Sequence, residues 1–264
     1  GNDYLAVERS VVECAYAGCE TIWIVCNDDI QPLIRYRLGD YVNDPVWMNR
    51  QNYTAFSSEE RKEIPIFYVP IHPQDRSKRD CLSWSILYGA LTAYHISTRI
   101  SKWITPKRYY VSFPYSVYDP HTLRQHRKKI SSDKGFFLSY NNKTVKDGEY
   151  LGFTFNEEEF IRYRKVIRSG TGLYYPNKDG GIPTDMLPKE ERWSARFFEL
   201  GDVFKTADIE NSTVVDLDWF YNIETWENYS GFMSSEYILK RPSKHVLLYR
   251  EFNPIGVDND SVLC

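Results

Sequence analysis

DYLAVERSVVECAYAGCETIWIVC, residues 3–26, holds the first helix and the first strand that the sequence predicts. Apolar side chains recur at helical spacing over residues 5–15, Asp3 can cap the start, and Gly18 stands where a left-handed C-terminal cap is needed. Residues 21–26 form a continuous apolar run, which is typical of a strand in a parallel sheet covered by helices. Because a helix leading into such a strand should return from an earlier strand, we expect a preceding strand and loop to be missing from this sequence.

The same unit recurs along the chain. Further strands are predicted at residues 64–69, 108–113, 135–139, 150–155, 213–217 and 245–249. Helices are predicted at residues 30–38, 81–95, 120–130, 189–204 and 225–239, and a short helix is predicted after the cap residue Asn156. This alternation indicates βαβ crossovers. We therefore expect one α/β domain over residues 1–264, with a mostly parallel, doubly wound, Rossmann-like sheet and helices on both faces. Glycines and prolines gather between residues 140 and 210, which predicts an irregular, loop-rich insertion or lid within the domain.

The composition is that of an ordinary globular protein, with 42% hydrophobic and 26% charged residues. A net charge of −3 gives no electrostatic footprint for nucleic acid, so no nucleic-acid partner is expected. No apolar stretch approaches the ~20 residues of a membrane span, and no signal-peptide pattern is present, so we expect no membrane partner. The five cysteines are odd in number and lack zinc-ligand spacing, which is typical of reduced thiols in the cytoplasm.

Aromatic residues make up 16% of the chain. Such a content suits an aromatic-rich core, and it also suits a pocket that stacks bases or sugars. Composition leaves both interpretations open, and it does not decide whether the chain forms a homo-oligomer.

Residues 75–90, DRSKRDCLSWSILYGA, place a polar loop with three cations directly before a helix. The first turn of a helix offers unpaired N–H groups and the positive end of the dipole, which favour a phosphate or carboxylate. Lys78 and Arg79 are therefore candidate phosphate-binding residues. The same sequence pattern also fits a solvated, capped loop that binds no ligand. Asp28 and Asp29, at the carboxyl end of the first strand, are candidates because ligands bind there in open α/β sheets.

Residues 109–120, YYVSFPYSVYDP, and residues 215–229, VDLDWFYNIETWENY, each combine a strand end with polar side chains. Asp119 either caps the helix that follows Pro120 or serves as a metal ligand. Asp216 and Asp218 are two apart, so on a strand they point the same way, either as an acidic pair for a divalent ion or as a solvated face.

Together with residues 17–26 and 75–90, these stretches resemble, in their order along the chain, the sugar-phosphate nucleotidyltransferases, a family with a GT-A-like fold that makes nucleotide sugars. Residues 109–120 are similar to the family pattern in which a strand-end aspartate holds Mg²⁺, with Tyr115 or Ser116 at that position here. Residues 222–225, NIET, are similar to its late D/N-I-x-T motif near the metal and phosphates. The Gly-rich phosphate loop of the family is not in this sequence.

The resemblance implies a nucleotidyltransferase that joins a nucleoside triphosphate to a sugar phosphate or a related phosphate acceptor and releases pyrophosphate. It implies that Lys78 and Arg79 are the catalytic cations. The Mg²⁺ ligands that it implies are Asp119, Asp216 and Asp218. The substrate-binding residues that it implies are Asp28, Asp29, Tyr115, Ser116, Asn222 and Glu224. Two alternatives stay open. One is a non-catalytic binding protein on the same scaffold, and the other is a glycosyltransferase that binds a nucleotide sugar and uses Asp216-Leu-Asp218 as its D-x-D motif.

Overall fold

The computed structural model describes residues 5–46, 63–73, 75, 81–100, 105–170, 185–188 and 198–240. Its first element is helix α1 (Ala6–Ala17), where the sequence predicts a helix. The carboxylate of Glu8 accepts a hydrogen bond from the N–H of Leu5 at 3.0 Å and so caps the first turn. Gly18 ends the helix in a left-handed conformation, with φ at 94°, as the capping pattern predicts. The predicted cap residue Asp3 lies outside the described residues.

Strand β1 (Ile22–Cys26) belongs to a sheet of order β1-β3-β2. Helix α2 (Gln31–Leu38) follows β1, and the sheet is completed by β2 (Tyr41–Asn43) and β3 (Glu63–Pro70). β1 and β3 run parallel, whereas β2 pairs with β3 in the antiparallel direction. The helix between β1 and β3 allows this parallel pairing, because a parallel connection needs a long crossover.

A second sheet has the order β4-β7-β6-β8. Its strands are β4 (Tyr109–Val111), β6 (Phe136–Ser139), β7 (Phe153–Phe155) and β8 (Thr213–Asp216). β6 and β8 are parallel, and β7 is antiparallel to both β4 and β6. Two short strands, β5 (Ser116–Val117) and β9 (Tyr221–Asn222), form a separate antiparallel pair.

The class is therefore α/β, with open mixed sheets in place of the expected mostly parallel one. The connection from β6 to β7 explains part of this difference. It covers residues 140–152 and contains only a short 3₁₀ helix, η3 (Val145–Asp147), besides a tight turn. Without a crossover helix, β7 returns beside β6 in the opposite direction.

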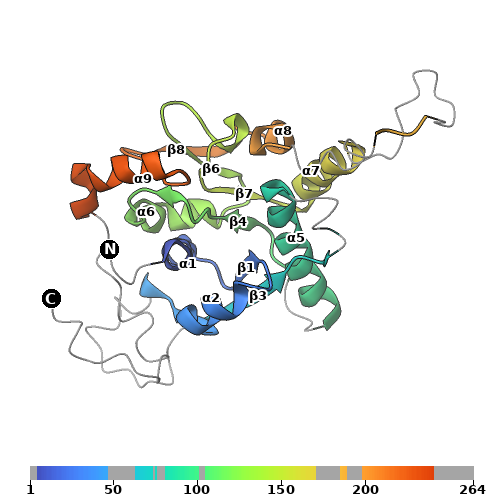
Figure 1. Ribbon diagram of the computed structural model, residues 1–264, viewed down its shortest axis with the longest axis horizontal. Helices are drawn as coiled ribbons and strands as arrows, with labels where there is room; N and C mark the ends of the chain where they lie inside the picture. Colours follow the sequence, from blue (N-terminus) through green and yellow to red (C-terminus); the bar gives the residue numbers. More distant parts are fainter. Residues whose placement is uncertain are drawn as a thin grey trace.

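Helices cover both faces of the sheets (Figure 1). Besides α1 and α2, they are α5 (Leu82–His95), α6 (His121–Ile130), α7 (Glu157–Gly170), α8 (Leu200–Phe204) and α9 (Trp226–Met233). α5 continues into a π-helical turn, η2 (Ile96–Ile100), and α9 is followed by the 3₁₀ helix η5 (Glu236–Lys240). α1 packs against α6 on one face, and α5 packs against α7 and α8 on the other. The helices predicted at residues 30–38, 81–95 and 120–130 are confirmed within a residue or two at each end.

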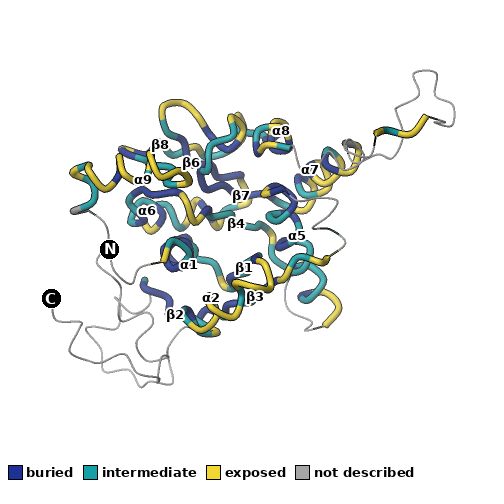
Figure 2. The backbone as a smooth tube through the Cα atoms, viewed as in Figure 1, coloured by how far each residue is buried: buried dark blue, intermediate teal, exposed yellow. Residues whose placement is uncertain are grey.

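Two apolar clusters lie on the two faces of the sheets, and their residues are buried in Figure 2. The first joins α1 to Ile22 and Ile66 of the first sheet and to Phe136 and Leu138 of the second. The second, here called the aromatic cluster, is rich in aromatic side chains and includes Phe113, Phe137, Phe153, Phe155, Tyr163 and Phe204. A substantial part of the high aromatic content thus forms the core.

Two elements predicted between residues 140 and 210 are present: β7 lies within the predicted strand 150–155, and Asn156 caps α7 by accepting from the N–H of Glu159 at 2.9 Å. α7 is longer than the short helix that the sequence predicts. The described part of this segment contains β7, α7 and α8, and Phe153, Phe155 and Phe204 from it are fully buried. Cys14, Cys19, Cys26 and Cys81 are free thiols, as expected for reduced cysteines. Among the described helices, none has the length and apolarity to cross a membrane.

Candidate functional site

The pairing of β5 with β9 brings together two segments that are more than 100 residues apart in the sequence. Ser116 lies opposite Asn222, and the N–H of Ile223 donates to the carbonyl of Tyr115 at 2.8 Å. The hydroxyl of Ser116 donates to the carbonyl of Tyr150. Four of the six residues predicted to bind substrate, namely Tyr115, Ser116, Asn222 and Glu224, therefore belong to one cluster.

The side chain of Tyr150 links the two segments. Its hydroxyl donates to Oε1 of Glu224 at 3.0 Å, and its ring stacks on Phe113 at 5.4 Å. Oδ1 of Asn222 accepts from the N–H of Glu224 at 3.1 Å, which orients the Asn222 amide. Thr225 then caps α9 through a 3.2 Å hydrogen bond from the N–H of Asn228. These contacts hold the 222–225 segment in one conformation at the start of a helix.

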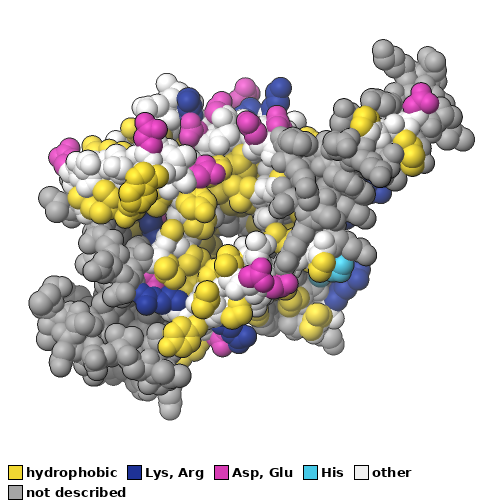
Figure 3. Space-filling view, viewed as in Figure 1, with side chains coloured by type: hydrophobic (Ala, Val, Ile, Leu, Met, Phe, Trp, Pro, Cys, Tyr) yellow, Lys and Arg dark blue, Asp and Glu magenta, His cyan; other side chains and the backbone are white. Residues whose placement is uncertain are grey.

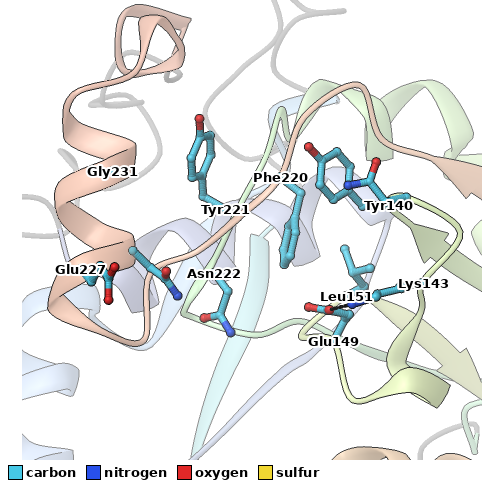
Figure 4. Close-up of a pocket in the computed structure, with 11 residues that line it drawn as sticks. Tyr140, Lys143, Glu149, Leu151, Phe220, Tyr221, Asn222, Glu227 and Gly231 are labelled. Carbon is cyan, nitrogen blue, oxygen red and sulfur yellow. Dashed lines mark hydrogen bonds and ion pairs between the residues drawn. The ribbon is translucent and has the colours of Figure 1, made fainter.

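A cavity of about 370 Å³ opens beside this cluster, within the range of small-molecule pockets (Figure 4). Phe220 and Asn222 extend to one side of the chain and Tyr221 to the other, as neighbours along a strand do. The lining comes from the turn after β6, the segment that follows it, β9 and α9, and consists of Tyr140, Asn141, Lys143, Glu149, Leu151, Phe220, Tyr221, Asn222, Glu227, Asn228 and Gly231.

The wall formed by the turn after β6 is rigid for a local reason. Asn141 and Asn142 have positive φ values of 51° and 62°, and Tyr140 and Lys143 exchange two backbone hydrogen bonds of 3.0 Å. This is the geometry of a two-residue hairpin turn, which asparagine tolerates well. The ring of Tyr140 lies 5.8 Å from that of Phe220, and Lys143 pairs with Glu149 at 3.4 Å. The Asn-Asn pair is a turn signal that the sequence analysis missed.

The carboxylates predicted to bind metal have separate surroundings. Asp119 caps α6 through a 2.9 Å hydrogen bond from the N–H of His121, which is the first of its two predicted roles. Asp216 is the last residue of β8 and accepts from the hydroxyl of Ser139 at 3.0 Å, whereas Asp218 lies beyond the end of the strand; both side chains are exposed. Within the described ranges, no three His, Cys, Asp or Glu side chains are grouped closely enough to hold a metal ion.

The remaining predicted residues lie elsewhere. Asp28 and Asp29 are exposed in the turn after β1, which belongs to the other sheet, and they do not line the cavity. Lys78 and Arg79 lie outside the described residues. Conversely, Tyr140, Lys143 and Tyr150 stand at the site although the sequence analysis did not select them. Nothing in the local pattern around Tyr150 identifies its long-range contact with Glu224.

Tyr150 gives the cluster a measurable dependence on pH. Burial, together with the hydrogen bond to Glu224, raises the pKa of Tyr150 to about 12, against about 10 in an unfolded chain. The folded protein thus holds this proton more tightly, and the stabilisation is present below about pH 10 and lost as the pH rises through about 12. We expect the melting temperature to fall across this window, and to fall less steeply for Tyr150→Phe. Equal slopes for the two proteins, measured by thermal denaturation in matched buffers, would contradict this assignment.

Comparison with models of known protein families finds no match to this chain. Comparison with curated proteins likewise finds none.

Proposed function

We propose that this protein is a nucleotidyltransferase, built on a variant of the doubly wound GT-A-like sheet, that handles a sugar phosphate or nucleotide sugar in the cavity beside β5 and β9. The observation that supports this most is the convergence of Tyr115 and Ser116 with Asn222 and Glu224. The resemblance in the sequence implies that these two segments meet at one substrate site, and nothing in either segment alone requires them to pair.

The lining suits a hydroxylated ring. The rings of Tyr140 and Phe220 offer apolar faces on which a sugar can pack, and the amides of Asn222 and Asn228 can both donate and accept hydrogen bonds. Lys143 lies at the same wall, paired with Glu149 at 3.4 Å, and its side chain is 61% exposed, so in our proposal it exchanges this partner for a ligand phosphate. Sites of this kind use a few polar groups to orient a ligand against an apolar surface.

In the proposed reaction, a phosphate oxygen of the sugar phosphate forms a bond to the α-phosphorus of the nucleoside triphosphate. The bond from that phosphorus to the bridging oxygen breaks, and pyrophosphate leaves with the electron pair. The residues of the cavity bind and orient the acceptor, which is the main protein contribution in such transfers. Mg²⁺ would neutralise phosphate charge, but the three predicted carboxylates do not converge, so no step is assigned to a metal ion here.

A non-catalytic binding protein is the second candidate. Asp119 is engaged as a helix cap, and Tyr115, at the position of the metal-binding aspartate in the resemblance, is 47% exposed. The cavity would then bind the same ligand class without turnover. The glycosyltransferase alternative depends on Asp216 and Asp218, which are exposed at and just beyond the end of β8 and do not line the cavity.

Thermal denaturation with a ligand panel tests the proposal. The panel contains nucleoside triphosphates, sugar phosphates and nucleotide sugars, each with and without Mg²⁺. A cavity ligand at about 100 times its Kd should raise the melting temperature by about 5 °C or more. Phe220→Ala should abolish the shift, whereas Tyr36→Ala, an exposed aromatic truncation on α2, should retain it.

The outcomes separate the candidates. Pyrophosphate release from a triphosphate and a sugar phosphate supports the nucleotidyltransferase, and stabilisation without any turnover supports the binding protein. Stabilisation by a nucleotide sugar, with sugar transfer and without pyrophosphate release, favours the glycosyltransferase. If no member of the panel changes the melting temperature, the site is not a nucleotide-sugar site.

A further inference from the structure

Helix α1 ends in a Schellman motif that brings two cysteines together. The N–H of Gly18 donates to the carbonyl of Ala15 at 3.2 Å, and the N–H of Cys19 donates to the carbonyl of Cys14 at 3.1 Å. These two backbone hydrogen bonds define the motif, together with the left-handed conformation of the glycine between them. Cys14 and Cys19 are therefore the two residues that the longer-range hydrogen bond of the cap joins.

The side chains of these two residues are in contact as well. In a Schellman motif, the residues joined by the longer-range hydrogen bond frequently pack against each other. Here both side chains pack on the first apolar cluster, and their thiols are hydrogen-bonded to each other. That hydrogen bond, followed by burial, raises the pKa of Cys14 well above its usual range, so Cys14 is a protonated thiol at neutral pH.

The backbone geometry permits a covalent bond between the two sulfurs. A disulfide needs Cα atoms that are about 4.4–6.8 Å apart. The Cα atoms of Cys14 and Cys19 are connected through one carbonyl group, one hydrogen bond of 3.1 Å and one N–Cα bond. With standard bond lengths this path spans about 7 Å when it is straight, and any bend shortens it. The end of the helix can therefore keep its conformation when the disulfide forms.

The cap of α1 is held in place by α6. Arg127 of α6 donates to the carbonyl of Ala15 at 3.4 Å and pairs with Asp44 at 2.6 Å. A Cβ added at Gly18 would lie 2.8 Å from Nε of Arg127, so this side chain packs directly on the cap. The two thiols are thus held together by a rigid local structure.

A small molecule can reach this pair. Cys14 and Cys19 are partly exposed, whereas Cys26 and Cys81, the other two described cysteines, are buried. The sulfur of Cys81 also caps α5 by accepting from the N–H of Trp84 at 3.4 Å. Figure 3 shows a hollow lined by hydrophobic side chains in the middle of the face, where α1 leads into β1 in Figure 1.

We propose that Cys14 and Cys19 are a redox-active pair, which a low-molecular-weight disulfide such as oxidised glutathione converts into an intramolecular disulfide across the cap of α1. The Cys19 thiolate forms a bond to one sulfur of the oxidant, whose S–S bond breaks, and one glutathione thiolate leaves with the electron pair. The Cys14 sulfur then loses its proton, bonds to the Cys19 sulfur and releases the second glutathione thiolate. The two departing thiolates take up the two thiol protons, so the protein loses the two electrons that the oxidant gains.

Thiol mapping of the full chain in glutathione redox buffers tests this inference. After equilibration, acid quenching and alkylation, cleavage after glutamate separates residues 14–20 from Cys26, because Glu13 and Glu20 flank the pair. We expect the 14–20 peptide to lose both alkylation sites together and to be two hydrogen atoms lighter than its reduced form. Thiols held in contact have an effective concentration above the millimolar range of short flexible linkers. With reduced glutathione at about 1 mM, the internal disulfide should therefore exceed the mixed disulfide by about tenfold or more.

Two variants and one denatured sample complete the test. Cys19→Ser should leave Cys14 alkylated or joined to glutathione, whereas Cys26→Ser should retain the internal disulfide unchanged. In urea that unfolds the chain, the excess of internal over mixed disulfide should fall by about tenfold or more, because the cap that holds the thiols together is lost.

Three results would overturn the inference. They are the absence of the internal disulfide from every redox buffer, a disulfide that joins Cys19 to Cys26 or Cys264, and an equal preference for the internal disulfide in the folded and the unfolded chain. Nucleotide-sugar binding plays no part in these measurements, so the test is independent of the proposed function.

Discussion

Replacing Glu13 by alanine is expected to lower the free energy of unfolding by about 3–5 kcal/mol, because it leaves a buried cation without its partner. Glu13 on α1 is fully buried, and its carboxylate pairs with Nε of Arg9 at 2.8 Å. It also accepts from the hydroxyls of Ser112 at 2.6 Å and Tyr118 at 2.9 Å. Arg9 is itself only 6% exposed and donates to the carbonyl of Tyr118. The cluster joins α1 to the segment after β4.

Chemical denaturation of three further variants separates charge from packing. Asp40→Ala removes an ion pair of similar length, 2.7 Å to Arg35, whose side chains are more than half exposed. It should cost about 1 kcal/mol or less. Glu13→Gln keeps acceptor capacity and should fall between the two. Adding Arg9→Met to Glu13→Ala should recover part of the loss, since both charges are then gone. A Glu13→Ala cost no larger than that of Asp40→Ala would show that the buried pair contributes little.

Phe153→Ala should be comparably destabilising, by about 3–5 kcal/mol, because the cavity it creates lies in the middle of the aromatic cluster. Phe153 is fully buried on β7, stacks on Phe137 at 6.0 Å and meets Phe204 edge-on at 4.9 Å. Neighbours on several elements make full collapse of the cavity difficult. Phe153→Leu should cost clearly less, since it retains most of the apolar volume.

Trp226→Ala is the matched control for this second prediction. It removes a larger ring, but Trp226 is 80% exposed in the first turn of α9. Its effect should stay within about 0.5 kcal/mol. Equilibrium unfolding in urea, with m-values compared among variants, provides the measurement. Equal losses for Phe153→Ala and Trp226→Ala would mean that the aromatic cluster does not dominate stability.

The longer helices were predictable because their signals are local. α1, α2, α5 and α6 each combine apolar spacing with a cap or a stop, and Gly18 and Gly39 end the first two as the sequence indicates. Buried runs such as residues 22–26 likewise identified β1, β3 and β6. Each of these predicted helices and strands depends on a few neighbouring residues and on an apolar face that must be buried.

The direction of pairing and the shortest strands were not predictable in the same way. β5 and β9 have two residues each, too few to show any periodicity, and they pair across more than 100 residues. The antiparallel return of β7 follows from the structure of residues 140–152, whose asparagine turn was not recognised. The sequence marked residues 115–116 and 222–224 through their resemblance to a known family, but the cavity beside them depends on Tyr140, Lys143 and Phe220, which only the fold brings together.

The buried contacts of Glu13 have a consequence for synthesis on the ribosome. Tyr118 follows Glu13 by 105 residues, so the carboxylate emerges long before the hydroxyl that it will bind. At elongation rates of about 5–20 residues per second, this interval lasts on the order of 5 to 20 s. During that time α1 can form as a helix, but Glu13 on it cannot yet bind the hydroxyl of Tyr118. The nascent segment that precedes Tyr118 therefore remains dependent on the later segment, and we expect it to be protease-sensitive until residues beyond Tyr118 are available.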